Sequence, residues 1–169
     1  IFHSISAFCN AGFDLMGMKY GQYASLTAFS GDVLVNIVIM SLILIGGIGF
    51  IVWDDISKNK LNFKRYKLHS KIVLSISMIL VFGGGLIFYF TEGKGIFFGM
   101  GFRERLLSSL FAAVSPRTAG FNTTDTMKMS QAGKLLTVVL MFIGAGSGST
   151  AGGIKISTFL YLLLWRYKN

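Results

Sequence analysis

The sequence Gly144-Ala-Gly-Ser-Gly-Ser-Thr-Ala-Gly-Gly153 lies near the middle of an apolar run that extends over residues 135–165. One straight helix of that length would measure about 46 Å, well beyond the roughly 30 Å hydrocarbon core of a membrane. Glycine is among the poorest helix formers, so we predict two half-helices joined here by an irregular loop at membrane depth. Because non-helical backbone is tolerated there only when it is buried in protein or lines an aqueous cavity, the loop is a candidate functional site.

The composition also indicates a membrane protein. Of the 169 residues, 53% are hydrophobic and 14% are charged, whereas a soluble domain carries about 25% charged residues. The 21 glycines and the single proline suit closely packed membrane helices. The one cysteine, Cys9, excludes an intrachain disulfide framework and offers no metal-binding pattern. We therefore predict an all-α polytopic membrane protein.

Charge distribution predicts the topology. Residues 33–53, 72–90 and 135–154 are apolar runs of spanning length. Residues 54–71 carry six Lys and Arg, whereas the much longer connection 91–134 also carries six. By the positive-inside rule, residues 54–71 and 166–169 are predicted to be cytoplasmic and residues 91–134 external. The net charge of +9 comes in short stretches between uncharged runs, so it indicates topology and no nucleic-acid partner.

An internal repeat marks two equivalent turns. Ala11-Gly12-Phe13-Asp14 recurs 108 positions later as Ala119-Gly120-Phe121-Asn122. Each copy follows a short apolar helix, the second predicted over residues 103–114 and too short to span, and each precedes a predicted spanning helix. A single copy would be interpreted as a glycine helix cap. Two copies in the same topological place favour a pair of pore-lining turns.

These turns have the chemistry of a potassium site. A potassium ion that sheds its water needs a ring of oxygens at fixed spacing, and backbone carbonyls supply it where glycine permits unusual dihedrals. The negative C-terminal end of a short helix pointing into the membrane also favours a cation. The candidate ion-binding residues, through their backbone, are Asn10, Ala11, Gly12, Thr118, Ala119 and Gly120.

Three stretches resemble the Trk/Ktr/HKT superfamily of potassium transporters. The sequence FHSISAFCNAGFD at residues 2–14 resembles the filter of the second repeat, and SPRTAGFNTT at residues 115–124 that of the third. The sequence GSGSTAGGIK at residues 146–155 resembles the intramembrane loop that interrupts the second helix of the third repeat. The resemblance covers the chain from end to end, with the motifs in the family's order.

The resemblance implies a pore of four repeats, each with a helix M1, a pore helix and a helix M2, and one filter glycine per repeat. Residues 1–56 would end repeat two, residues 57–71 would be a cytoplasmic link, and residues 72–169 would form repeat three with its broken M2. The other repeats are missing, so we expect this sequence to be a piece of a larger chain. The resemblance further implies potassium uptake without a cofactor, a homodimer of the full-length subunit in the cell membrane, and a cytoplasmic ring of nucleotide-binding RCK-type subunits.

The glycine-rich loop is predicted to be the gate of this pore. Its near match to a phosphate-binding P-loop fails, because Ile154 separates the second glycine from Lys155 and no strand precedes it. Small residues let a loop pack in a pore and move at low steric cost. Lys155 either opposes cations near the path or snorkels toward the cytoplasmic interface. The gate residues are Gly144, Gly146, Ser147, Gly148, Ser149, Thr150, Gly152, Gly153 and Lys155.

Other interpretations stay open. Sodium is an alternative to potassium, as the transported ion, a co-substrate or a regulator. A membrane enzyme would need an activated nucleophile, and no His or carboxylate lies near Ser147 or Ser149 in the sequence. A non-conducting membrane protein is the third alternative. Arg117, a costly charge at membrane depth, is predicted to brace the filter with Asp125 or Asp14 as its partner.

Overall fold

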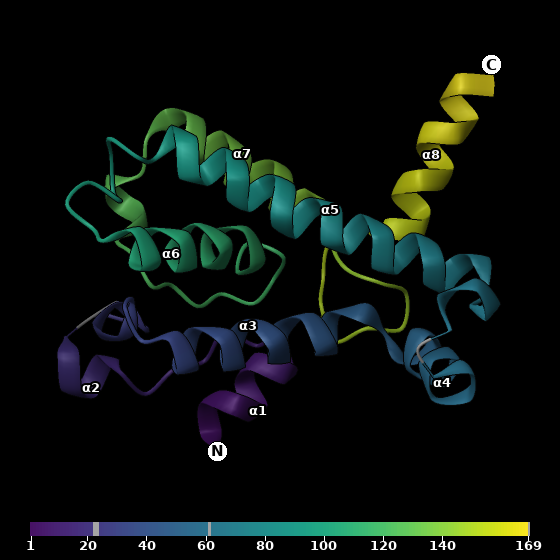
Figure 1. Ribbon diagram of the computed structural model, residues 1–169, viewed down its shortest axis with the longest axis horizontal. Helices are drawn as coiled ribbons and strands as arrows, with labels where there is room; N and C mark the ends of the chain where they lie inside the picture. The colour runs from purple at the N-terminus through teal and green to yellow at the C-terminus, as the bar shows by residue number, and fades with distance from the viewer. Residues whose placement is uncertain (22–23, 61, 169) are drawn as a thin grey trace.

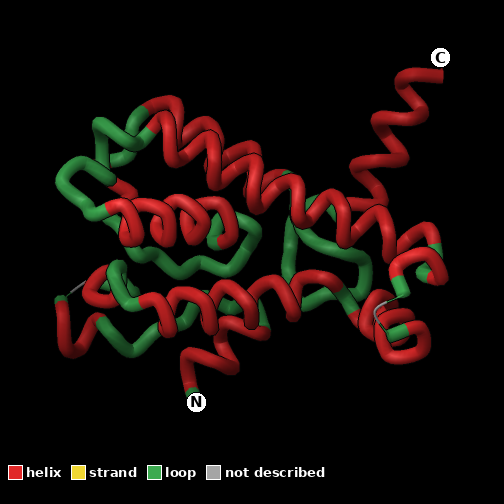
Figure 2. The backbone as a smooth tube through the Cα atoms, viewed as in Figure 1, coloured by secondary structure: helices red, strands yellow, loops and turns green. Residues whose placement is uncertain are grey.

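The chain folds into helices joined by turns and one long loop, as Figures 1 and 2 show. The computed structural model describes residues 1–21, 24–60 and 62–168, so position 61 of the predicted link and position 169 of the predicted cytoplasmic end lie outside the described residues. The helices confirm the predicted all-α class. They are α1 (Phe2–Phe8), α2 (Gly17–Tyr20), α3 (Val33–Ile48), α4 (Phe50–Asn59), α5 (Leu68–Thr91), α6 (Phe102–Val114), α7 (Gln131–Phe142) and α8 (Ile156–Lys168), with 3-10 turns at Thr27–Phe29, Phe63–Arg65 and Thr126–Lys128.

Helix α5 contains the whole of the predicted span over residues 72–90, and it is long and apolar enough to cross a membrane. It has 24 residues, which is about 36 Å of helix. Within the described ranges it is the single helix that is long and apolar enough to cross a membrane by itself. A second crossing exists if α3 and α4 count as one bent span. Helix α7 is apolar but only 12 residues long, about 18 Å, which fits the half-helix predicted for the first part of the run 135–165.

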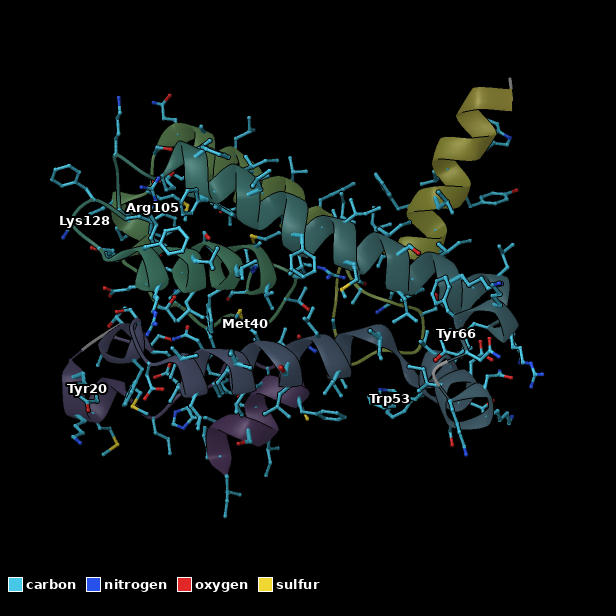
Figure 3. The ribbon with its side chains drawn as sticks, in the orientation of Figure 1. Tyr20, Met40, Trp53, Tyr66, Arg105 and Lys128 are labelled. Carbon is cyan, nitrogen blue, oxygen red and sulfur yellow. The ribbon has the colours of Figure 1, made fainter. Side chains whose placement is uncertain are left out.

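The predicted span over residues 33–53 forms a bent pair of helices, because the helix breaks at Gly49. Helices α3 and α4 meet there at 96°. Gly49 has a φ of +92°, a conformation that glycine adopts without a Cβ penalty. The indole of Trp53 folds back across the bend, and its Nε1 donates to the Ile45 carbonyl (3.0 Å; Figure 3).

The glycine-rich loop causes this break by entering the hydrogen-bond ladder of the helix. In an unbroken helix the Phe50 N–H would donate to the Gly46 carbonyl, four residues earlier. Here the Phe50 N–H donates to the Gly148 carbonyl (3.1 Å), and the Gly46 carbonyl accepts from the Thr150 N–H (3.3 Å). Insertion of another group into the ladder is a recognised cause of sharp kinks. The exchange also satisfies the loop's own backbone, as membrane depth requires.

The predicted short helix over residues 103–114 is confirmed as α6, which lies between α5 and α3 (Figure 1). Its close approach to α5 depends on glycine: a Cβ on Gly85 would lie 2.8 Å from Leu110 Cδ2, and one on Gly84 would lie 3.2 Å from Ala113 Cβ. On the other side, α6 and α3 bury a shared apolar cluster. Its fully or nearly fully buried members are Ala7, Leu26, Ile39, Met40, Ile43, Val81, Phe111, Val114, Ala119 and Phe121, of which Figure 3 labels Met40.

The connection over residues 91–134 forms one end of the helix bundle, and polar contacts hold this end together. Glu92, at the end of α5, is fully buried and accepts a hydrogen bond from the Ser130 N–H (3.1 Å). The Ser130 hydroxyl caps α7 by accepting from the Gly133 N–H (3.1 Å). Nearby, the Arg105 guanidinium lies over the Tyr89 ring (4.1 Å) and donates to the Tyr89 carbonyl (2.8 Å; Figure 3). These contacts join α5, α6 and α7, so the helices on either side of the turn after α6 are held in fixed positions.

Candidate functional site

The two repeated turns share an unusual backbone. In the first turn φ is +51° at Asn10 and +72° at Gly12, and in the second it is +74° at Thr118 and +79° at Gly120. A positive φ is uncommon for a non-glycine residue. Within the described residues only four non-glycine positions adopt one, and two of these four are the equivalent positions Asn10 and Thr118. The repeat seen in the sequence is therefore also a repeat of backbone conformation.

The fold brings the two turns into contact. A Cβ on Gly12 would lie 2.7 Å from the Ala119 carbonyl oxygen and 3.1 Å from the Gly120 Cα, and a Cβ on Gly120 would lie 3.2 Å from the Gly12 Cα. A side chain at Gly12 or Gly120 would be strained by the positive φ, and it would also collide with the backbone of the other turn. The six candidate ion-binding residues lie together, at the ends of the short helices α1 and α6.

Hydrogen bonds hold each turn to its helix and to the other repeat. The Ala11 N–H donates to the Ser6 carbonyl (2.9 Å) and the Ala119 N–H to the Ser115 carbonyl (3.0 Å). The Asn122 N–H donates to the Ser25 hydroxyl (3.0 Å), which lies in the segment between α1 and α3. The two copies differ after the glycine, since Phe121 is buried in the shared core whereas Phe13 is exposed.

The predicted break in the apolar run 135–165 is confirmed, because α7 ends at Phe142 and α8 begins at Ile156. The two ends of the loop between them lie side by side and are joined by hydrogen bonds. There the Gly144 N–H donates to the Ile154 carbonyl (3.0 Å), and the Ile154 N–H donates to the Phe142 carbonyl (3.2 Å). Figure 2 shows the loop passing from α5 across to α3.

The loop also contacts both repeated turns. The Asn10 side-chain amide donates to the Thr150 hydroxyl (2.9 Å), which itself donates to the Phe8 carbonyl (3.0 Å). On the other turn, the Thr118 hydroxyl accepts from the Gly152 N–H (2.9 Å). The candidate gate and the candidate ion site are therefore neighbours in space, although 140 residues separate Asn10 from Thr150 in the chain.

The remaining gate residues hold the loop together from within. The Lys155 ammonium donates to the Ala151 carbonyl (2.6 Å), and the Ser147 and Ser157 hydroxyls lie 2.7 Å apart. The Ser149 hydroxyl oxygen is buried and has no hydrogen-bond partner among the described residues. The role of Lys155 as a barrier or as a snorkelling cation stays a prediction.

Arg117 is buried behind the turns, but its predicted partners are wrong. Its guanidinium donates to the Ser77 hydroxyl (3.2 Å) and, at 3.5 Å, to the Gly144 carbonyl of the loop. Asp14 instead accepts from the Met16 N–H (3.0 Å), and Asp125 pairs with Lys128 (3.4 Å). A polar contact to this largely apolar helix was missed, and the signal for it in the sequence is the pair of serines, Ser75 and Ser77, within the run 72–90.

The chemistry of this site is that of neutral oxygens. The described part of the chain has no group of three or more His, Cys, Asp and Glu side chains that could hold a metal ion. The turns and the loop offer main-chain carbonyls, hydroxyls and one amide in their place. Such groups can replace the water around a weakly hydrated monovalent cation.

Fold and site together define an all-helical membrane transporter. The crystal structure of the potassium transporter TrkH from Vibrio parahaemolyticus has the same fold, with a TM-score of 0.79 over 98% of this chain and 34% of that chain, at 24% identity. The model of the TrkH family of cation transport proteins matches residues 1–166. The chain belongs to this family, which comprises transport proteins and not enzymes, as the sequence predicted.

Curated relatives agree with this assignment. The chain is 47% identical over 165 residues to the potassium/sodium uptake protein NtpJ of Enterococcus hirae. It is 42% and 37% identical to the Ktr system potassium uptake protein B of Bacillus subtilis and of Vibrio alginolyticus. These matches cover 97%, 96% and 99% of this chain but only 35%, 36% and 36% of the relatives. The chain thus spans about a third of their length.

Proposed function

We propose that the full-length protein moves potassium ions into the cell through a pore whose ion sites are the main-chain carbonyls of residues 10–12 and 118–120. The observation that carries the proposal is the shared backbone of the two turns, with positive φ at equivalent positions and contact between Gly12 and Gly120. Relatives named as potassium or potassium/sodium uptake proteins support the choice of ion.

The surroundings of the turns suit a cation without a carboxylate. Helix α1 ends two residues before its turn and α6 four residues before its own, so the negative C-terminal end of each helix dipole lies on the side of the turn. Carbonyls bind potassium strongly enough to replace its water yet weakly enough to release it. Sodium, alone or alongside potassium, is the second candidate ion, and the name of the Enterococcus hirae relative favours keeping it in the test.

The loop over residues 143–155 acts as the gate in this proposal. It contacts both turns and replaces a piece of the α3 ladder, so in this position it lies across the space next to the ion site. Glycines at its contacts leave no side chain to hinder movement: a Cβ on Gly146 would lie 2.3 Å from the Ile48 carbonyl oxygen. If the loop moves away, the Gly46 carbonyl and the Phe50 N–H, which now bind the loop, need other hydrogen-bond partners.

The membrane setting and the partners of the full-length protein are part of the proposal. We place it in the cell membrane as a multi-pass protein, with residues 54–71 and 166–169 cytoplasmic and residues 91–134 external. The basic link and the region after Trp165 then face a cytoplasmic ring of RCK-type regulatory subunits, and the full-length subunit forms a homodimer. The Lys and Arg in residues 54–71 support the cytoplasmic side, and the resemblance to the Trk/Ktr/HKT superfamily supports the ring and the homodimer.

The test is a glycine substitution in the full-length protein. Cells that lack their own potassium uptake systems would express wild type, Gly120→Ser or Gly99→Ser, and uptake of rubidium and of sodium would be measured. Gly120→Ser is expected to lower the preference for rubidium over sodium by about tenfold, equivalent to about 1.4 kcal/mol. Gly99 is the matched control, because its φ of +83° is similar but no atom lies within 4 Å of an added Cβ.

Three results decide between the alternatives. Loss of selectivity in Gly120→Ser but not in Gly99→Ser supports the carbonyl site. Sodium uptake that exceeds rubidium uptake in the wild type selects the sodium transporter. Wild-type protein that reaches the membrane and moves neither ion overturns the proposal.

A further inference from the structure

The two turns hold the loop through side chains at equivalent positions. Asn10 and Thr118 are separated by the repeat interval of 108 residues. Each reaches the loop with a hydrogen bond of 2.9 Å, Asn10 to the Thr150 hydroxyl and Thr118 to the Gly152 N–H. In the proposed function the backbone carbonyls of the turns bind the ion, so the side chains of Asn10 and Thr118 remain available to bind the loop.

The Thr118 contact supports a strained backbone. A β-branched residue with positive φ is an outlier, and left-handed backbone costs roughly 1–2 kcal/mol for residues other than glycine. Such conformations persist only where neighbours determine them. The Gly152 N–H is such a neighbour, because it donates to the Thr118 hydroxyl. When the loop leaves, Thr118 loses this support, and the turn that carries Ala119 and Gly120 is less firmly held.

The Asn10 contact works in the same direction. Asn10 is 8% exposed, and the alternative acceptor for its amide, the Ile43 carbonyl, is 3.4 Å away. Departure of Thr150 would leave a buried amide with one long hydrogen bond, and also the Phe8 carbonyl of α1 without the hydroxyl that donates to it. Unmet buried donors are costly, so this turn too favours the loop in place.

We propose that Asn10 and Thr118 are positioning residues that latch the loop to the two turns, so that the geometry of the ion site and the release of the gate are coupled. This inference rests on the proposed function. Coupling of two equilibria is reciprocal. An ion that holds the turns in shape therefore stabilises the latched loop, and a released loop weakens the discrimination between ions.

The experiment removes one latch contact at a time in the full-length protein. Thr118→Val and Thr150→Val keep side-chain shape but delete the hydroxyl, and Thr118→Ser and Thr150→Ser restore it. Rubidium flux is measured in proteoliposomes without any cytoplasmic partner. Each Val variant is expected to raise this partner-independent flux by about threefold to tenfold, as loss of one net hydrogen bond predicts. The Ser variants return it toward wild type.

A reporter in the loop tests the coupling directly. Ser149→Cys, in a protein whose other cysteines (Cys9 included) are replaced, puts a thiol where the native hydroxyl oxygen is buried. Its labelling by a maleimide is expected to slow as potassium fills the turns. That dependence on potassium is expected to disappear in Thr118→Val and Thr150→Val. Thr137→Val is the control, because its hydroxyl bonds to the Gly133 carbonyl within its own helix (2.9 Å).

The outcomes separate the latch from the proposed function. Flux and labelling that match wild type in both Val variants overturn the latch while leaving potassium uptake intact. Equal changes in Thr137→Val overturn it as well, since they would mark a general loss of packing. A wild-type protein that moves no cation at all instead overturns the proposed function. Elution as a single species in detergent confirms that each variant is folded.

Discussion

Arg117 is a buried cation that finds neutral partners. Its guanidinium lies 5% exposed beside the Ser77 hydroxyl and the Gly144 carbonyl. A cavity of about 10 Å³ next to it is lined by Asn10, Ser77 and Arg117 among others, close to the smallest volume that holds one water molecule. Because no carboxylate of the described residues is in hydrogen-bond contact with the guanidinium, each neutral partner contributes more to its stability than it would at a surface.

Loss of the Ser77 hydroxyl is therefore expected to destabilise the protein. Ser77→Ala leaves a buried charged donor short of a partner, at a cost of about 1–3 kcal/mol. Ser75→Ala, on the exposed side of the same helix, is expected to change the free energy of unfolding by less than about 0.5 kcal/mol. Thermal unfolding of both variants in detergent measures the difference. Equal stability would mean that Arg117 does not depend on Ser77.

At the scale of elements, the bend between α3 and α4 and the loop between α7 and α8 form one structural feature. The loop supplies the hydrogen bonds that the helix gives up, so neither irregularity would be satisfied without the other. Glycine is required on both sides of this contact. A Cβ on Gly49 would lie 2.5 Å from the Ser147 carbonyl oxygen.

Gly49→Ala is expected to disturb both elements. Positive φ costs alanine roughly 1–2 kcal/mol, and the collision with the loop backbone adds about 1–3 kcal/mol. Gly21→Ala isolates the first cost, because Gly21 has a φ of +102° and no atom of the described residues beyond its chain neighbours lies within 4 Å of an added Cβ. The difference between the unfolding temperatures of the two variants measures the cost of the collision with the loop backbone. A Gly49→Ala variant no less stable than Gly21→Ala would contradict the close contact.

At the scale of the molecule, the segments that carry the two turns share one apolar core. Residues from α1, α3 and α6 bury one apolar cluster together with Leu26, Ala119 and Phe121, and the Ser25–Asn122 hydrogen bond lies beside it in the sequence. Because each turn packs against this core, the position of one turn relative to the other depends on how the core packs. Close-packed interiors transmit such constraints.

Truncation of this core should lower stability more than truncation of the outer helix surface. Ile39→Ala removes a side chain that is 5% exposed, at an expected cost of about 2–5 kcal/mol. Ile37→Ala, two residues away on α3 and 50% exposed, is expected to cost distinctly less. Chemical denaturation in detergent compares them. Equal losses would show that another part of the full-length protein covers Ile37 as tightly.

Much of this architecture could be predicted from local pattern. Composition and run length indicated membrane helices, and poor helix propensity placed the break between α7 and α8. The interval of 108 residues identified the two turns as equivalent from the sequence alone. The bend within the predicted span over residues 33–53 was not foreseen, because the loop backbone that takes over hydrogen bonds of this helix lies about 100 residues away in the sequence. The partners of Arg117 were missed for the same reason.

The sequence by itself determined which segments are apolar, where glycine permits irregular backbone and which two turns are equivalent, since these depend on residue type and spacing along the chain. Tertiary structure alone decided that the loop enters the α3 ladder and that Asn10 and Thr118 reach it. A backbone donor can choose among several acceptors of nearly equal strength. That choice depends on which of them the packed helices bring within about 3 Å.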